Sequence, residues 1–139
     1  MTNSALLLDT HIWFKHQTLP HLLKPAIVDA IDQAAERNEV FVSVISIWEF
    51  AMLERDGKLE LDGGVDRWCR EALAKPGIAL LPLSPQIAID SVYLKEPMHK
   101  DPADRILVAS ARVERLTLVT RDRAILNCAE AIGLICLPA

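Results

Sequence analysis

Apolar residues recur along the chain in two patterns, and each pattern predicts a different kind of element. Short apolar runs predict strands at residues 5–8, 40–44, 78–81, 117–120 and 134–137, of which the second and the fourth are expected to be buried. Apolar positions at three- and four-residue steps predict helices at residues 25–37, 47–55, 65–74, 85–93 and 102–115. Residues 10–14 are interpreted as a short helix or loop, and a further short helix is expected after Asp122.

The order of these elements predicts the fold class. Strands that alternate with helices form βαβ units, which take right-handed crossovers and build a parallel sheet covered on both faces. We therefore expect an α/β fold, a three-layer α/β/α domain with a central, mainly parallel five-stranded sheet. A length of 139 residues is near the usual size of one domain, so residues 1–139 are expected to form a single domain.

Composition narrows the functional classes. Hydrophobic residues make up 51% of the chain, which excludes an intrinsically disordered protein. A net charge of −4 argues against a wide phosphate-binding surface, but it leaves open a local site where metal ions carry the positive charge. The cysteines Cys69, Cys128 and Cys136 show no C-x-x-C spacing and are expected to be reduced thiols.

The sequence shows no sign of a membrane segment. No apolar run approaches the roughly 20 residues that a membrane-spanning helix needs. The first ten residues, MTNSALLLDT, lack the basic and the long apolar segments of a signal peptide. We therefore expect a cytoplasmic protein that does not associate with membranes.

The segment from His99 to Asp122 holds two acids at chemically important positions. Asp101 followed by Pro102 is a helix-start signal, with an acceptor side chain at the N-cap and a proline in the first turn. Asp104 then lies in the first helical turn, and Asp122 lies just beyond the carboxyl end of the next strand. Ligands of open α/β sheets bind outside the carboxyl ends of the strands, so both acids are expected near the binding edge.

Two more acids are expected at the same edge, because Asp9 follows the first strand and Glu49 lies in the first turns after the second. Each acid also has a structural explanation. Asp9 and Asp122 suit N-cap positions. Glu49 suits a capping box with Ser46, and Asp104 suits one with Asp101. For any one acid taken alone, capping is the favoured interpretation.

As a group, the four acids indicate a metal site. Four carboxylates close together repel one another unless they are protonated or bind a cation. Oxygen ligands alone favour a hard ion such as Mg²⁺ or Mn²⁺ over zinc. Such ions hold a phosphodiester, lower the pKa of a bound water and stabilise the leaving oxygen of an in-line displacement.

Four segments of the sequence contain these acids in a set order and spacing: LLLDTHIW, SVISIWEFA, DPADRILVASA and LTLVTRD. Together they resemble the PIN-domain ribonucleases, especially the VapC toxins of bacterial toxin–antitoxin pairs, from Leu6 to the last strand. The resemblance implies a Mg²⁺- or Mn²⁺-dependent endoribonuclease that cleaves RNA phosphodiester bonds. It implies that the catalytic metal ligands are Asp9, Glu49, Asp104 and Asp122, and that the water they activate is the nucleophile.

Further residues are expected near this site. Thr10 and Thr120 stand beside ligands, where they would orient them by hydrogen bonds or form plain turns. Asp101 is a candidate extra ligand, with capping as the favoured role. Three basic residues are candidates for contacts with RNA phosphates, or for ion pairs with the local acids: Lys100, Arg105 and Arg121.

The histidines and tryptophans are assigned no catalytic role. His99 lies nearest the proposed site, but the four histidines lack the spacing of a metal cluster and are interpreted as mostly surface groups. Trp13, Trp48 and Trp68 fall on apolar helical stretches and are expected in the core or at a subunit interface.

The resemblance also implies partners. VapC proteins are commonly homodimers, and a small VapB antitoxin inhibits them by laying an extended or helical segment over the active site. In this chain, Leu53, Leu59 and Leu61 are candidates for a partner groove or for ordinary core positions.

Three other functions compete with the nuclease. An aspartyl-phosphate phosphotransferase also uses an aspartate after the first strand, but haloacid-dehalogenase-like chemistry needs a second acid where this chain has His11. A receiver-like phosphoacceptor domain needs a lysine after a late strand, where Arg121 and Asp122 stand. In a non-catalytic α/β binding module, the acids would only cap helices.

Overall fold

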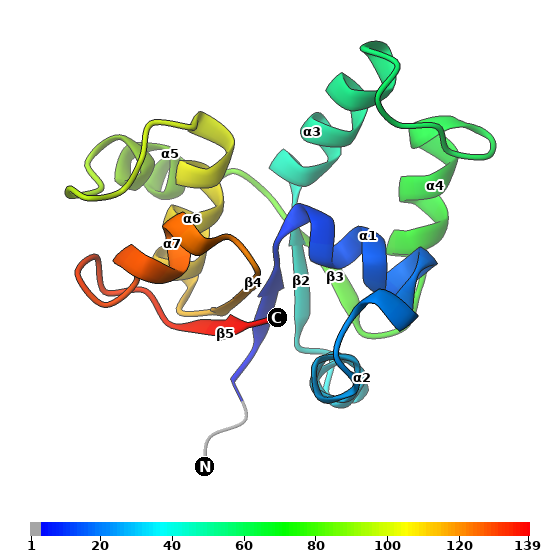
Figure 1. The fold of residues 1–139 in the computed structure, drawn as a ribbon, viewed down its shortest axis with the longest axis horizontal. Helices are drawn as coiled ribbons and strands as arrows, with labels where there is room; N and C mark the ends of the chain where they lie inside the picture. Colours follow the sequence, from blue (N-terminus) through cyan, green and yellow to red (C-terminus); the bar gives the residue numbers. More distant parts are fainter. Residues whose placement is uncertain (1–3) are drawn as a thin grey trace.

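Five strands form one sheet in the computed structural model, which describes residues 4–139. They are β1 (Leu6–Leu8), β2 (Val40–Ser43), β3 (Ile78–Leu81), β4 (Thr117–Thr120) and β5 (Cys136–Pro138). All neighbouring strands pair in parallel, in the order β3-β2-β1-β4-β5 (Figure 1). The predicted α/β fold with a five-stranded parallel sheet is confirmed.

Helices fill the connections between the strands. They are α1 (Thr10–Thr18), α2 (Pro25–Glu36), α3 (Val44–Arg55), α4 (Gly64–Leu73), α5 (Pro85–Val92), α6 (Pro102–Glu114) and α7 (Arg123–Cys128), with a 3₁₀ turn at Pro20–Leu22. The segment 10–14, left open between helix and loop, is the start of α1. Prolines occupy the first position of α2, α5 and α6, where a missing N–H costs no hydrogen bond.

Four strand boundaries differ from the prediction. β1 begins one residue later, at Leu6, and β5 ends one residue later, at Pro138. Val44 begins α3 instead of ending a strand, because the Ser43 hydroxyl accepts a hydrogen bond from the Ile45 N–H at 3.0 Å and caps the helix. The last strand begins at Cys136, two residues later than expected. A turn with Gly133 at φ 68° keeps Leu134 beside the end of α7, where its N–H donates to the Ala129 carbonyl.

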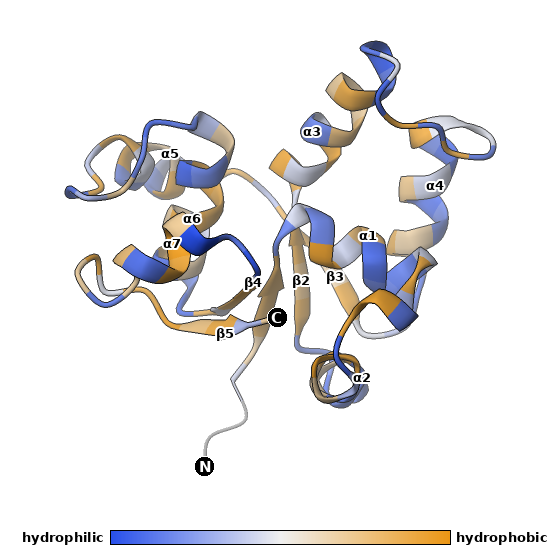
Figure 2. Ribbon diagram, viewed as in Figure 1, coloured by the Kyte–Doolittle hydropathy of each residue, from blue (hydrophilic) through white to orange (hydrophobic). Residues whose placement is uncertain are grey.

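Side chains of β1 alternate between two hydrophobic layers, which fixes the three-layer architecture. Leu6 and Leu8 pack in one layer with residues of α1, α2 and α4, whereas Leu7 packs in the other with α6 and α7. Figure 2 shows the apolar strands running between the two groups of helices. Full burial of a leucine side chain such as Leu7 stabilises the fold by about 1.5–3 kcal/mol.

An aromatic cluster anchors α1 to α3 and α4. Trp13 is fully buried, and its ring centroid lies 5.0 Å from that of Trp68 and 5.6 Å from that of Phe50. Trp48 is 51% exposed, so it is not a core residue of this chain. Leu59 and Leu61 are partly buried against the same layer, and Leu53 is also partly buried.

The strand order creates a switch point beside β1. From β1 the chain proceeds to β2 and β3 on one side, and β4 then returns to the opposite side of β1. β1 leads into α1 and β4 leads into α7, and these two helices belong to different hydrophobic layers. Such a divergence leaves a crevice at the carboxyl ends of the two strands, where ligands of open α/β sheets bind.

Among residues 4–139, no helix combines the length and hydrophobicity of a membrane span.

Candidate metal centre

A cleft of about 370 Å³ opens at the carboxyl ends of β1 and β4. All four predicted acids line it, Asp9, Glu49, Asp104 and Asp122. Asp101, Thr10, His11, Ile12, Lys15 and Arg121 complete its walls. The sequence-based expectation that distant acids meet at one edge of the sheet therefore agrees with the structure.

Asp9 is the most deeply held acid, at 8% exposure. Its Oδ1 accepts a hydrogen bond from the Thr10 N–H at 2.7 Å, and its Oδ2 accepts one from the Thr120 hydroxyl at 2.7 Å. Burial raises the pKa of this carboxyl, and the two hydrogen bonds partly offset the rise. Asp9 therefore caps α1 and faces the cleft at the same time.

Glu49 is positioned from β1 through Thr10. The Thr10 hydroxyl donates to Glu49 Oε1 at 2.6 Å and lies 2.7 Å from the hydroxyl of Ser46. The capping box predicted for Ser46 and Glu49 is wrong, because the N-cap of α3 is Ser43. Ser46 is instead fully buried one helical turn before Glu49, where it holds Thr10. The i, i+3 spacing of Ser46 and Glu49 is the sequence signal that they share a helix face.

Asp101 and Asp104 have separate tasks. Asp101 caps α6, since its Oδ1 accepts from the N–H groups of Ala103 at 2.9 Å and Asp104 at 3.2 Å. The reciprocal half of the predicted capping box is missing, because the Asp101 N–H donates to His99 Nδ1 instead. The Asp104 side chain is thus not required for capping.

Asp104 has the most perturbed carboxyl group of the cleft. Burial, followed by the nearby negative charges of Asp101, Asp9, Asp122 and Glu49, raises its pKa to about 7. Burial likewise raises the pKa of Glu49, while the hydrogen bond from Thr10 opposes the rise. Negative charge in this cleft is therefore costly unless a cation joins it.

Asp122 follows β4, caps α7 and also lines the cleft. Its Oδ1 accepts from the N–H groups of Ala124 at 2.8 Å and Ile125 at 3.2 Å, which caps α7. Capping occupies only this oxygen. The Asp122 N–H donates to the Thr120 hydroxyl at 3.0 Å, so Thr120 connects it to Asp9. Of the roles left open for Thr10 and Thr120, orientation of the acids is the one that these hydrogen bonds support.

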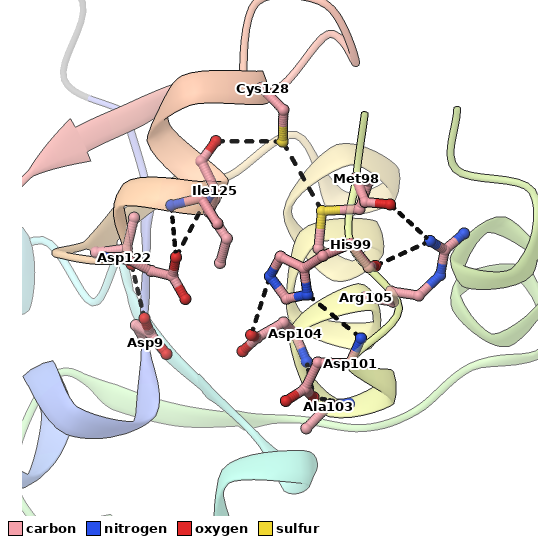
Figure 3. Close-up of polar contacts among 12 residues, drawn as sticks. Asp9, Met98, His99, Asp101, Ala103, Asp104, Arg105, Asp122, Ile125 and Cys128 are labelled. Atoms are coloured by element: carbon pink, nitrogen blue, oxygen red, sulfur yellow. Dashed lines mark hydrogen bonds and ion pairs between the residues drawn. The ribbon is translucent and has the colours of Figure 1, made fainter. Parts of the chain in front are cut away.

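The tightest group of ligand atoms lies on one wall of the cleft. One atom each of His99, Asp104 and Asp122 lie within 4.8 Å of one another, and Figure 3 shows these side chains between α6 and α7. Asp9 and Glu49 also line the cleft but fall outside this group. His99 was not recognised as a site residue from the sequence, because its neighbours in space come from two different elements.

The basic residues divide between cleft and scaffold. Arg121 is exposed and lines the cleft, with its guanidinium also donating to the carbonyls of Ala139 and Leu22. The guanidinium of Arg105 donates to carbonyls within the fold, so this side chain supports the scaffold, and its expected contact with RNA phosphates stays a prediction. Lys100 is exposed and lines a neighbouring hollow, outside this cleft.

The donor set of the cleft suits a hard divalent cation. Its carboxylates supply oxygen ligands, the kind that Mg²⁺ and Mn²⁺ prefer. Within residues 4–139, no lysine or arginine forms an ion pair with any of the four acids, so their charge is not neutralised by the chain's strongest cations. The elevated pKa of Asp104 is the expected mark of such an uncompensated cluster.

Comparison with known proteins identifies the family. The sequence profile of the PIN domain matches residues 6–131, which includes all four acids. The chain belongs to the PIN-domain family. This PIN domain is 32% identical over 120 residues to Ribonuclease VapC22 of Mycobacterium tuberculosis, covering 86% of this chain and 88% of that relative.

Solved structures support the fold of this PIN domain. VapBC2 from Rickettsia felis, bound to a promoter DNA fragment, aligns with a TM-score of 0.71 at 16% identity, covering 96% of this chain and 97% of that chain. FitAcB from Neisseria gonorrhoeae aligns with a TM-score of 0.64 at 23% identity, covering 95% and 96%. The PIN-like architecture implied by the sequence segments is confirmed.

Proposed function

We propose that this PIN domain is a Mg²⁺- or Mn²⁺-dependent endoribonuclease, the toxin of a VapBC-type toxin–antitoxin pair. One observation carries the proposal. Four carboxylates line a single cleft at the switch point, and their proximity and burial raise the pKa of Asp104 to about 7. The similarity to Ribonuclease VapC22 supports RNA as the substrate and, with it, action in the cytoplasm.

The acids would hold the metal and the chain would orient them. Asp9, Glu49, Asp104 and Asp122 are the proposed ligands. A divalent ion bound there would supply Lewis-acid chemistry, polarising a phosphodiester and acidifying a water. Thr120 and Thr10 each donate to one carboxylate, which fixes Asp9 and Glu49 without consuming a charge.

RNA would approach from the open side of the cleft. Arg121 and Lys15 lie in its walls and are the basic groups placed to contact phosphates beside the scissile bond. Their small number agrees with the net charge of −4, which provides little long-range attraction for RNA. Binding would therefore depend strongly on the cation held by the acids.

The residues near Asp9 argue against an aspartyl-phosphate enzyme. Haloacid-dehalogenase-like chemistry needs a second acid where this chain has His11. Both oxygens of Asp9 accept hydrogen bonds, which hold the buried carboxylate in place. This arrangement fits an oriented metal ligand.

An antitoxin would compete for the same acidic cleft. The structural relatives include VapBC2 from Rickettsia felis and a toxin–antitoxin complex from Klebsiella pneumoniae. An inhibitory VapB-type segment that delivers a basic side chain to the acids would neutralise them in place of a cation. A hollow lined by Phe14, Leu61 and Trp68 lies along α1 and α4 and offers apolar contacts to such a segment.

The outer face of α5 supports the proposed homodimer. Ile89, Val92 and Tyr93 are 56%, 70% and 77% exposed, respectively. Leu80 of β3 and Leu83, which follows it, are also exposed. Ile89, Val92 and Tyr93 stand at positions i, i+3 and i+4 and so share one side of the helix end. Exposed apolar side chains that lie together are typical of interaction surfaces, and these three define the proposed dimer surface.

RNA cleavage tests the function directly. Purified protein would be incubated with a mixed RNA pool and Mn²⁺ or Mg²⁺, with and without EDTA, beside Asp9→Asn, which retains a capping side chain. Cleavage that requires metal and is lost in the variant is expected. Intact RNA with a normally folded, metal-loaded protein would instead support the non-catalytic binding module.

A further inference from the structure

His99 makes two contacts that involve both nitrogens of its ring. It lies between α5 and α6 with its side chain 33% exposed. Its Nε2 lies 3.3 Å from Asp104 Oδ2, and its Nδ1 lies 3.3 Å from the backbone nitrogen of Asp101 (Figure 3). The ring therefore bridges the acid that lines the cleft and the residue that caps α6.

These contacts fix which nitrogen carries the proton. A backbone N–H can only donate, so Nδ1 accepts from Asp101 and has no hydrogen. In a neutral imidazole the hydrogen must then be on Nε2, the nitrogen that lies 3.3 Å from Asp104 Oδ2. The backbone thus selects the tautomer, and the tautomer makes His99 a donor toward Asp104.

Arg105 holds the backbone of this segment in place. Its guanidinium donates to five carbonyls, those of Ser91, Val92, Leu94, Met98 and His99. The bond to the His99 carbonyl is 3.1 Å long. Because Arg105 follows Asp104 directly on α6, the same helical turn presents the acid and fastens the residue that contacts it.

We propose that His99 is a positioning residue, which donates from Nε2 to Asp104 Oδ2 and leaves Oδ1 of that acid to a divalent cation. This rests on the proposed metal-dependent function. A role as a direct ligand is the competing arrangement, since His99, Asp104 and Asp122 lie within 4.8 Å. Direct ligation would need the Nε2 lone pair, moving the proton to Nδ1 and leaving the Asp101 N–H without its acceptor. The observed contacts favour the positioning role.

Manganese binding to the intact protein tests the proposal. Isothermal titration calorimetry would compare the wild type with His99→Phe, which keeps a flat ring but has no donor, and with His99→Gln, which restores an N–H donor. Loss of a hydrogen bond to a metal ligand typically weakens affinity by about 10- to 100-fold. We expect this loss for His99→Phe and a substantial recovery for His99→Gln. His16→Phe, whose histidine pairs with Asp32 instead, is the matched control and should bind as the wild type does.

Pulsed electron paramagnetic resonance of the Mn²⁺-loaded wild type gives an answer that needs no variant. The positioning role predicts no directly coordinated ¹⁴N, whereas a strong histidine ¹⁴N coupling would overturn it in favour of ligation. Equal Mn²⁺ affinity in wild type and His99→Phe would also overturn it, with the proposed function intact. A wild type that binds no Mn²⁺ would remove both proposals together.

Discussion

The hydroxyl of Thr120 donates to Asp9 Oδ2 at 2.7 Å, across 111 positions of sequence. Thr120 ends β4 and is fully buried, and Asp9 follows the neighbouring strand β1. The hydroxyl oxygen of Thr120 also accepts a hydrogen bond from the Asp122 N–H. One side chain therefore connects two acids that follow adjacent strands. The Thr120 hydroxyl therefore holds Asp9 and Asp122 in position at the cleft.

Replacing Thr120 with valine should remove this link at nearly constant volume. The Asp9 carboxylate would remain buried with one unsatisfied oxygen, which costs roughly 1–3 kcal/mol. We expect urea denaturation to show that loss in the free energy of unfolding, together with weaker Mn²⁺ binding. Thr120→Ser keeps the hydroxyl and should retain most of both. Equal stability of Thr120→Val and the wild type would contradict the role assigned to Thr120.

Removing charge at Asp104 should stabilise the metal-free protein. Asp104 is partly buried among other acids, and its neutral form is the favoured one up to about pH 7. In EDTA at pH 8, Asp104→Asn should therefore unfold at a higher temperature than the wild type. The expected gain in the free energy of unfolding is roughly 1–2 kcal/mol. Mn²⁺ should raise the melting temperature of the wild type far more than that of the variant. A destabilised variant would mean that Asp104 serves the fold and not a cation.

The raised carboxyl pKa values predict a pH dependence with a definite sign. Free carboxyls titrate near pH 4, whereas Asp104 titrates near 7 in the folded chain, and the pKa values of Asp9 and Glu49 are also raised. Between these pH values the folded state binds more protons than the unfolded state. The free energy of unfolding in EDTA should therefore fall as pH rises from about 4 to about 7.

Saturating Mn²⁺ should remove most of this decrease in the free energy of unfolding, because the cation replaces the protons bound to the acids. Thermal melts across this range, with EDTA and with Mn²⁺, measure both effects. A metal-free protein that grows steadily more stable up to pH 8 would show that the acids do not repel one another.

Arg105 is expected to be the most sensitive basic residue for stability. Replacing it with methionine would leave five carbonyls without its donors, some of them partly buried, at a cost of roughly 2–4 kcal/mol. Arg123→Met, at an exposed position on α7, should change stability by no more than about 0.5 kcal/mol. Chemical denaturation compares the two. Similar values for both variants would contradict the clamping role.

Charge on the outer face of α5 should separate the proposed dimer. Val92→Lys or Tyr93→Lys places a cation on the proposed dimer surface without disturbing a buried position. Light scattering coupled to size-exclusion chromatography should show a dimer for the wild type and a monomer for the variants. Ala26→Lys, on the exposed side of α2, should stay dimeric. A dimer that persists in both α5 variants would place the contact on another surface.

The sequence was sufficient for the features that depend on strand order. Asp9 and Asp122 follow parallel neighbouring strands, and parallel strands bring their carboxyl ends to one edge, so their proximity could be predicted without coordinates. Asp101 was also recognisable, because Asp-Pro at a helix start has a local cause. Short apolar runs likewise located the five strands of residues 4–139, although the edge strands β3 and β5 are only partly buried.

The sequence was not sufficient for contacts that depend on irregular backbone. The segment between α5 and α6 has no periodicity, so nothing indicated that Arg105 would bind its carbonyls or that His99 would face Asp104. Ser43 and Ser46 are both possible N-caps in the sequence, and only the observed cap at Ser43 shows that Ser46 does not form a capping box with Glu49. These side chains are placed by tertiary packing.

The position of β1 between β2 and β4 has a consequence for synthesis on the ribosome. β4 is synthesised after the first three strands, so the cleft lacks one of its strand ends until β4 pairs with β1. A nascent chain that stops short of Asp122 carries Asp9 and Glu49 without this fourth acid. The proposed RNA cleavage therefore cannot begin until the segment that carries Asp122 has been synthesised.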